Sequence, residues 1–404
     1  MKNQAKFDCK TQLKPKTTSL TKRLASATVA AAVFFCTVCA GFLHGCAGSL
    51  QGCAGFLHGC ARFIVYDGFA FHSPYRAEAY GNNLSDNTGK KITELLSELE
   101  KTFSTEKGGG VAAISSARAG ARVGINADLT SVLETTGFCF KLTDGKFDPT
   151  VFPLVKLWSF EPDFPVLNFS PPSKPEISEE LKTCGFEKII VTTGNGDSGN
   201  SGGYVEKTQS ETELAFGGIA KGYAADKIAE ILIADGAERG YVNVGTSSLR
   251  LISVEELGVR HPDDGEKRLL TIDCKRLKNV SVSTSGDYER FYEYEGERYC
   301  HIIDPETGYP AKTGVKSVTI ICGNGAAADG LSTALCLAKH DPDFPADLQK
   351  SELAALIKRI SDEPGLRGAL VFAAVEINGK KQILTNADEE TFSLSDKAYA
   401  VVKI

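Results

Sequence analysis

Apolar residues recur about every three to four positions in two segments of the chain, residues 92–103 and 128–142. This spacing places the apolar side chains on one face of a helix, so both segments are predicted to be helices. Residues 240–244, 281–285 and 317–322 have the composition of short strands instead. Because helical and strand patterns alternate along the chain, the sequence predicts an α+β fold.

The last part of the chain adds one predicted helix, at residues 351–360, and a predicted hairpin at residues 368–386. Asn378-Gly379 divides the hairpin, and this dipeptide favours a two-residue turn between antiparallel strands. Residues 162–174 are rich in proline, and residues 193–203 are polar and rich in glycine. Both are predicted to be irregular, the second as a hairpin tip without chemistry of its own.

Composition is consistent with one large globular unit, because 42% of the residues are hydrophobic and 24% are charged. The net charge is −6, which argues against nucleic-acid binding. Six of the 12 cysteines lie at or before residue 60. The others are scattered, and Cys300, Cys322 and Cys336 occupy apolar segments, so they are predicted to be small buried side chains rather than a disulfide framework.

The beginning of the chain has the layout of an export signal. Residues 1–23 contain seven Lys or Arg and one Asp, and residues 24–45 contain no charged side chain. The apolar part is long enough to span a bilayer if it is not cleaved. Removing residues 1–45 leaves a net charge of −12. The basic segment followed by an uncharged apolar segment predicts that the protein is exported.

A short repeat follows, CAGFLHG, CAGSLQG and CAGFLHG, with cysteines seven residues apart. Leu43-His44-Gly45-Cys46 resembles a lipobox, in which the cysteine becomes lipidated, and cleavage before Cys46 is the first expectation. Cys53 and Cys60 are further candidates. Residues 1–45 are thus predicted to be a lipoprotein signal peptide, 46–65 a linker and 66–404 the folded domain. The expected location is the outer face of the cytoplasmic membrane or the periplasmic side.

Asp329 and Thr333 are the first candidate for chemistry. They lie four residues apart in a predicted helix, so a carboxylate and a hydroxyl can be directed at one point. Oxygen ligands of this kind suit Mg²⁺, which completes its coordination with phosphates and water. The alternative is an Asp near a helix start and a Thr bonded to its own backbone.

Two further segments have features of a nucleotide-binding site. In residues 216–233 a Gly-Gly turn leads into a helix with Lys221 in its first turn, and free N–H groups at such a start attract phosphate. An ordinary helix start is the alternative. In residues 143–160 a turn precedes Phe147, Asp148 and the single Trp, a combination that suits a flat heterocycle and equally suits a core.

Four motifs, in this order, resemble the ApbE family of FAD:protein FMN transferases, and the resemblance extends from about Tyr66 to the C-terminus. They are GKFDPTV with PLVKLW (145–158), GGIAKGYAAD (217–226), TSGDYERFY through HIIDPETGYP (284–310) and ADGLSTAL (328–335). The resemblance implies a single large mixed α/β domain with a T-fold-like core. It also implies transfer of the FMN half of FAD to a Thr or Ser hydroxyl of an acceptor protein, with release of AMP.

The resemblance further implies roles for individual residues. The metal ligands would be Asp329, Thr333 and backbone oxygens of Ala220 and Ser332, with Mg²⁺ as the ion. His301 would be the catalytic base, unless it is a strand histidine bonded to a neighbouring carbonyl. The expected FAD-binding residues are Phe71, Lys146, Phe147, Asp148, Gly217, Lys221, Tyr223 and His301. Asp304 is expected to stabilise the turn formed by Asp-Pro-Glu-Thr-Gly rather than to take part in the chemistry.

The chain departs from the family pattern at a few places. Phe71 replaces a methionine expected against the flavin, and Ala215 stands where an acidic residue is usual. These departures concern cofactor affinity and target choice more than reaction class. Two other functions remain open, a Mg²⁺-dependent FAD pyrophosphatase and a non-catalytic FAD-binding lipoprotein. The expected acceptor is a subunit of a membrane redox complex or an extracytosolic flavoprotein.

Overall fold

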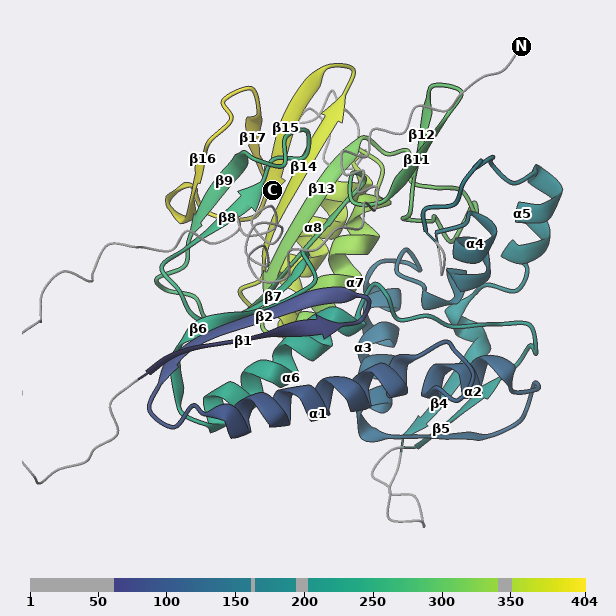
Figure 1. The fold of residues 1–404 in the computed structure, drawn as a ribbon. Coiled ribbons are helices and arrows are strands. Elements are labelled where there is room, and N and C mark those ends of the chain that lie inside the picture. Colours follow the sequence, from purple (N-terminus) through teal and green to yellow (C-terminus); the bar gives the residue numbers. More distant parts are fainter. Residues whose placement is uncertain (1–61, 161–163, 194–202, 341–350) are drawn as a thin grey trace, which may run out of the picture.

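The computed structural model describes residues 62–160, 164–193, 203–340 and 351–404 (Figure 1). The predicted signal peptide, the cysteine repeat and the tip of the predicted hairpin at 194–202 lie outside these ranges. The first strand begins at Arg62, inside the segment predicted to be a linker. No helix in the described ranges is long and apolar enough to cross a membrane.

A nine-stranded sheet forms the centre of the described part of the chain. Neighbouring strands are antiparallel except the last two, which are parallel. In spatial order they are β1 (Arg62–Ala70), β2 (Ser73–Gly81), β6 (Ala237–Val244), β7 (Ser248–Ser253), β10 (Lys278–Gly286), β13 (Val315–Cys322), β14 (Leu370–Ile377), β15 (Lys380–Thr385) and β17 (Ala400–Lys403).

Successive side chains of the sheet point to opposite faces and enter two different cores. On β14, Val371, Ala373 and Val375 face the helices, and Phe372 and Ala374 face the other side. The helices of the described ranges are α1 (Asp86–Phe103), α2 (Gly110–Ser116), α3 (Ala127–Leu142), α4 (Phe152–Leu157), α5 (Lys174–Leu181), α6 (Ala220–Ala234), α7 (Gly325–Cys336) and α8 (Glu352–Asp362). Figure 1 shows α1, α6 and α7 together on one side of the sheet.

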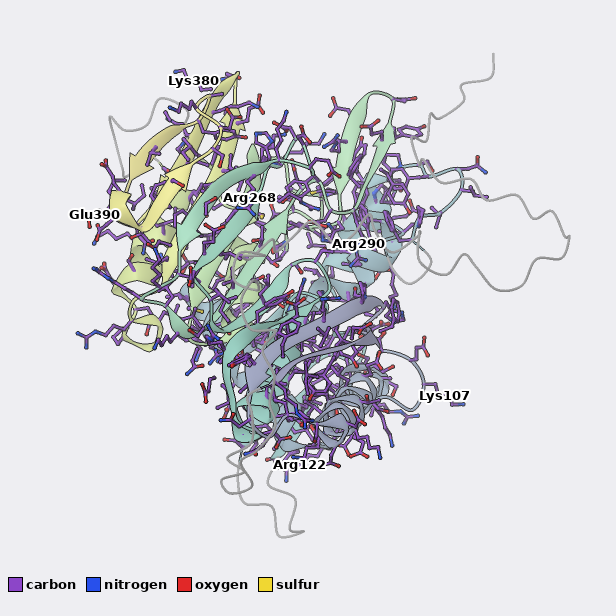
Figure 2. All side chains as sticks on the ribbon, turned by 60° about the vertical axis from the view of Figure 1, so that its left-hand side comes forward. Lys107, Arg122, Arg268, Arg290, Lys380 and Glu390 are labelled. Carbon is purple, nitrogen blue, oxygen red and sulfur yellow. The ribbon has the colours of Figure 1, made fainter. Side chains whose placement is uncertain are left out.

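Three smaller sheets complete the described structure. One packs on the other face of the large sheet through the second core and contains β8 (Glu256–Arg260), β9 (Arg268–Asp273) and β16 (Phe392–Leu394). The others are β3 (Val123–Ile125) with β4 (Ile189–Thr193) and β5 (Gly203–Lys207), and the hairpin of β11 (Phe291–Tyr294) and β12 (Glu297–Cys300). Arg290 is labelled at the base of this hairpin in Figure 2. Short 3-10 turns lie at Pro149–Val151, Phe186–Lys188, Pro364–Leu366 and Glu389–Thr391.

The predicted elements agree with this architecture. The helices expected at 92–103, 128–142 and 351–360 are α1, α3 and α8, and the expected hairpin is β14–β15. Asn378 and Gly379 both have positive φ, 52° and 76°, as a turn of this kind requires. The cysteines at 139, 184, 274, 300, 322 and 336 are buried free thiols, which confirms that prediction. The fold is a single mixed α/β domain.

Candidate functional site

The N-terminus of α6 is completed by a neighbouring helix. Its N-cap residue is Ile219, which provides no side-chain hydrogen bond to the N–H groups of the first turn. Asp329 of α7 takes this role, because its Oδ2 accepts a hydrogen bond from the Gly222 N–H at 2.7 Å. The carboxylate therefore lies at the positive end of the α6 dipole.

Asp329 is almost fully buried, with 4% of its surface exposed. Burial raises the pKa of its carboxyl, while Lys221 and hydrogen bonds from Ser283, Ser248 and Gly222 act in the opposite direction. The Ser248 hydroxyl on β7 donates to Oδ1 at 2.8 Å. A carboxylate that is costly to ionise at this depth gains free energy from any further cation beside it.

Thr333 and Ser332 lie one turn further along α7. The Thr333 hydroxyl donates to the Asp329 carbonyl at 3.0 Å and lies 3.2 Å from the Ser285 hydroxyl on β10. A Cβ added to Gly218 would approach Thr333 Oγ1 to 3.6 Å, so the Gly-Gly turn before α6 faces this hydroxyl. The Ser332 hydroxyl is fully buried and hydrogen-bonds to Ser283 and Ser285. The backbone bond predicted as the alternative for Thr333 is thus present.

These oxygens fit a hard cation. The described ranges contain no group of three or more His, Cys, Asp or Glu side chains arranged to hold a metal. An ion here would use one carboxylate, from Asp329, together with neutral oxygens. Each carboxylate oxygen has two lone pairs, so the bonds from Gly222 and Ser248 leave acceptor capacity on Asp329. A small number of protein oxygens supplemented by phosphate and water is the pattern that Mg²⁺ prefers.

Lys221 lies in the first turn of α6, and its ammonium donates to the Gly217 carbonyl at 2.9 Å. Its side chain passes the turn after β6, since a Cβ on Gly245 would lie 3.2 Å from Lys221 Cδ. The charge of Lys221 opposes the rise that burial causes in the pKa of Asp329, and it adds to the lowering of the pKa of His301. Lys221 and the proposed metal ligand Asp329 therefore meet at the start of α6, and the proposed base His301 lies within electrostatic reach of Lys221.

His301 directly follows β12, and its ring lies against Arg290 and Phe160. Its Nδ1 is 3.3 Å from the Arg290 carbonyl oxygen, and the Phe160 ring meets the imidazole edge to face at 6.3 Å. Because a carbonyl only accepts hydrogen bonds, Nδ1 carries the proton and Nε2 keeps a free lone pair. Burial and the charges of Arg290 and Lys221 lower the pKa of His301 to about 3. The imidazole is therefore neutral at pH 7, with its Nε2 unprotonated. The predicted alternative, a bond to a neighbouring carbonyl, is present and compatible with the predicted role as a base.

Phe71 and Tyr223 belong to one aromatic cluster, which also contains Phe103 and Phe216. The ring of Phe103 lies 6.5 Å from Phe71, 6.1 Å from Phe216 and 5.9 Å from Tyr223. Phe71 occupies the tight β1–β2 turn with φ of 52°, and its N–H donates to Glu100 at 2.8 Å. The Tyr223 hydroxyl donates to Asp128 at 2.8 Å. Phe103 and Phe216 are buried core residues, and the sequence does not predict that they meet Phe71 and Tyr223.

Lys146, Phe147 and Asp148 have supporting roles in the structure. Lys146 forms an ion pair with Glu352 of α8 at 3.0 Å. Phe147 is buried and packs against Gly218 and Gly330, whose added Cβ atoms would each lie 3.3 Å from its ring. The Asp148 carboxylate accepts hydrogen bonds from Thr150 and from the Phe186 N–H. Direct contact of these three residues with FAD stays a prediction; the structure shows them engaged with the protein itself.

Asp304 stabilises the turn that it begins, as predicted. Its carboxylate accepts hydrogen bonds from the Glu306 N–H at 2.9 Å and the Thr307 hydroxyl at 3.1 Å. Its N–H donates to the Tyr309 carbonyl. The turn fixes the chain just after His301.

Replacing Gly222 by alanine is expected to destabilise the protein and to displace Asp329. The new Cβ would lie 2.1 Å from the Gly325 carbonyl oxygen and 2.9 Å from Asp329 Cγ, so α6 and α7 must separate. Overpacking of this kind costs about 1–3 kcal/mol of unfolding free energy, measurable by urea denaturation. Gly323→Ala is the matched control, because no atom lies within 4 Å of its added Cβ. Equal stability of the two variants would contradict the close approach.

Comparison with known proteins identifies the family that the sequence motifs resemble. The ApbE family profile matches residues 71–357. FAD:protein FMN transferase from Treponema pallidum is 33% identical over 260 residues, which are 61% of this chain and 69% of that protein. The Haemophilus influenzae protein of the same name is 27% identical over 297 residues, covering 72% of this chain and 83% of its own length.

Two solved structures have the same fold. The ApbE protein from Thermotoga maritima superposes with a TM-score of 0.64 at 28% identity, covering 78% of this chain and 94% of that one. The flavin transferase ApbE from Vibrio cholerae superposes with a TM-score of 0.66 at 23% identity, covering 80% and 97%. With the family profile spanning most of the described domain, this chain belongs to the ApbE family.

Proposed function

We propose that the protein is an FAD:protein FMN transferase. The single observation that carries this proposal is the buried Asp329 carboxylate held at the N-terminus of α6, next to Lys221. A buried carboxylate that can hold a metal ion and a neighbouring cation can neutralise the charge of a phosphoryl group transferred from a dinucleotide. The names of the relatives from T. pallidum and H. influenzae support the same activity.

Mg²⁺ is the proposed cofactor, held by Asp329, Thr333 and backbone oxygens of Ala220 and Ser332. When bound, it would supply positive charge against the pyrophosphate of FAD. The Lys221 ammonium and the positive end of the α6 dipole would attract the same anion from the protein side. Gly217, Phe71 and Tyr223 are proposed to line the rest of the FAD site.

His301 would accept the proton of the incoming hydroxyl at Nε2, while its Nδ1–H remains bonded to the Arg290 carbonyl. The hydroxyl oxygen of an acceptor Thr or Ser forms a bond to the phosphorus of the FMN half. The bond from that phosphorus to the bridging oxygen breaks, and AMP leaves with the electron pair. The products are a phosphoester-linked FMN and AMP, without any change of oxidation state.

The rate of transfer is expected to change little between pH 8 and pH 6. Because the pKa of His301 is lowered from 6.5 to about 3, the neutral base persists well below the ordinary titration of histidine. The measurement is the pH dependence of single-turnover transfer at saturating Mg²⁺, so that metal loading does not limit the rate. A fall in rate with a midpoint near pH 6.5 would show that His301 titrates as an exposed histidine.

A Mg²⁺-dependent FAD pyrophosphatase is the second candidate, because the same groups could direct water at the same phosphorus. Incubation of the protein with FAD, Mg²⁺ and a Thr-containing acceptor protein separates the two by mass spectrometry. We expect the acceptor to gain the mass of FMN. FMN found only free in solution would reject the transferase, and FAD bound but unchanged would favour a non-catalytic flavin-binding protein.

We also propose that the protein is exported and anchored to the membrane by a lipid. The support is the basic and then uncharged layout of residues 1–45 and the lipobox-like Leu43–Cys46. The acceptor would then be a membrane redox subunit or an extracytosolic flavoprotein. Intact-mass analysis of protein extracted from membranes tests the anchor and identifies which of Cys46, Cys53 and Cys60 carries it.

A further inference from the structure

Helices α6 and α7 each supply a carboxylate that accepts a backbone N–H from the first turn of the other helix. Asp329 of α7 accepts the Gly222 N–H of α6 at 2.7 Å, and Asp226 of α6 accepts the Gly325 N–H of α7 at 2.7 Å. In each helix the glycine precedes the aspartate by four residues, so both lie on the face that meets the partner helix. We call Gly222, Asp226, Gly325 and Asp329 the α6–α7 clasp.

The backbones of the two glycines touch inside the clasp. A Cβ on Gly222 would lie 2.1 Å from the Gly325 carbonyl oxygen, and one on Gly325 would lie 2.3 Å from the Gly222 carbonyl oxygen. Each aspartate also accepts a serine hydroxyl from the sheet, Ser248 of β7 for Asp329 and Ser281 of β10 for Asp226. The arrangement is reciprocal, so a displacement at one aspartate is passed to the other through the glycine contact.

Asp226 has a partner that holds it in place. Arg250 Nη1 lies 3.4 Å from Asp226 Oδ1, 2.9 Å from the Ser281 hydroxyl and 2.9 Å from the Gly323 carbonyl. Burial raises the pKa of Asp226, and its bonds to Ser281, Arg250 and Gly325 oppose this. Arg250 thus ties the start of α7, through Gly323, to the carboxylate on α6.

We propose that Asp226, held by Arg250 and Ser281, is a positioning residue that sets the place of Asp329 at the metal site. This inference rests on the proposed function only in taking Asp329 as a metal ligand. Asp226 fixes the first residue of α7, and Asp329 follows it one helical turn later on the same face. Groups that orient a ligand without touching the metal typically change metal affinity or activity about 10- to 100-fold when replaced.

Asp226→Asn is the sharpest test. The N–H of Gly325 and the guanidinium of Arg250 only donate hydrogen bonds, and Ser281 donates to Oδ1 while accepting from Arg250. In Asp226→Asn the amide NH₂ must replace one of the two carboxylate oxygens. At either position it would face a hydrogen-bond donor, so one of these bonds would be lost. We expect Mn²⁺, used as the probe ion and counted by EPR, to bind about 10- to 100-fold more weakly to the variant.

Asp235→Asn is the matched control, because it removes a carboxylate from the other end of the same helix. Asp235 accepts hydrogen bonds from Thr88 at 2.7 Å and Lys91 at 2.7 Å, and its side chain is 16% exposed against 19% for Asp226. It should lower stability but leave Mn²⁺ affinity at the wild-type value. A purely structural role for Asp226 predicts the same behaviour for both variants, and that result would overturn the inference.

Amide hydrogen exchange gives a readout that needs neither metal nor activity. Asp226→Asn should speed exchange at the start of α6, where Asp329 protects the Gly222 N–H, whereas Asp235→Asn should speed it at the end of α6. Should Asp226→Asn fail to fold, Ser281→Ala removes one bond to Asp226 and should shift both readouts the same way by less. If Asp226→Asn and Ser281→Ala both exchange amide hydrogens and bind Mn²⁺ as the wild type does, the proposal is refuted. Wild-type protein that binds Mn²⁺ but transfers no FMN would refute only the transferase.

Discussion

Asp329→Asn is expected to lower kcat/KM for FMN transfer by about a thousandfold or more and to abolish the response to Mg²⁺. A metal contributes several kcal/mol of charge stabilisation to such a reaction, which corresponds to about that factor. The amide keeps the shape of the side chain, and its oxygen can still accept the Gly222 N–H. Loss of the negative charge, rather than loss of the helix contact, should therefore be what the assay reports.

The measurement is initial rate against Mg²⁺ concentration, combined with FAD binding followed by flavin fluorescence. Asp329→Ala should give the same loss and in addition destabilise the protein, because it leaves the start of α6 without its cap. Asp329→Asn protein that transfers FMN with unchanged Mg²⁺ dependence would remove Asp329 from the metal site.

His301→Ala should reduce transfer by about a hundredfold to ten-thousandfold, the usual contribution of a general base, while FAD remains bound. The polar partner of its ring among the described residues is the Arg290 carbonyl, so little of the surrounding structure depends on the imidazole. Loss of FMN on the acceptor with unchanged FAD affinity is the expected pair of results.

Added imidazole offers a positive control for this variant. Free imidazole can occupy the space left by the side chain and restore part of the rate, which a folding defect would not allow. His72 provides a comparison, because it is exposed in the β1–β2 turn and His72→Asn suits its positive φ of 55°. Undiminished transfer by His301→Ala would assign the base to another group.

Much of the fold follows from local sequence. The apolar spacing in residues 92–103 and the Asn378-Gly379 turn each specify an element by interactions within a few residues, and both elements are present. The segment around Asp148 shows what local sequence could not determine. Its polar and aromatic residues suited a flavin equally well, but the carboxylate holds Thr150 and Phe186, which lies 38 residues away.

The sequence by itself determined the helices and hairpins named above, the motif order that identifies the family, and the residue types able to hold Mg²⁺ and accept a proton. Only the tertiary structure decided where those groups stand. Asp329 reaches Gly222 across 107 residues and Asp226 reaches Gly325 across 99, and nothing in either segment alone specifies the meeting. The physical reason is that apolar periodicity acts within one element, whereas the approach of two helix ends depends on how the whole core packs.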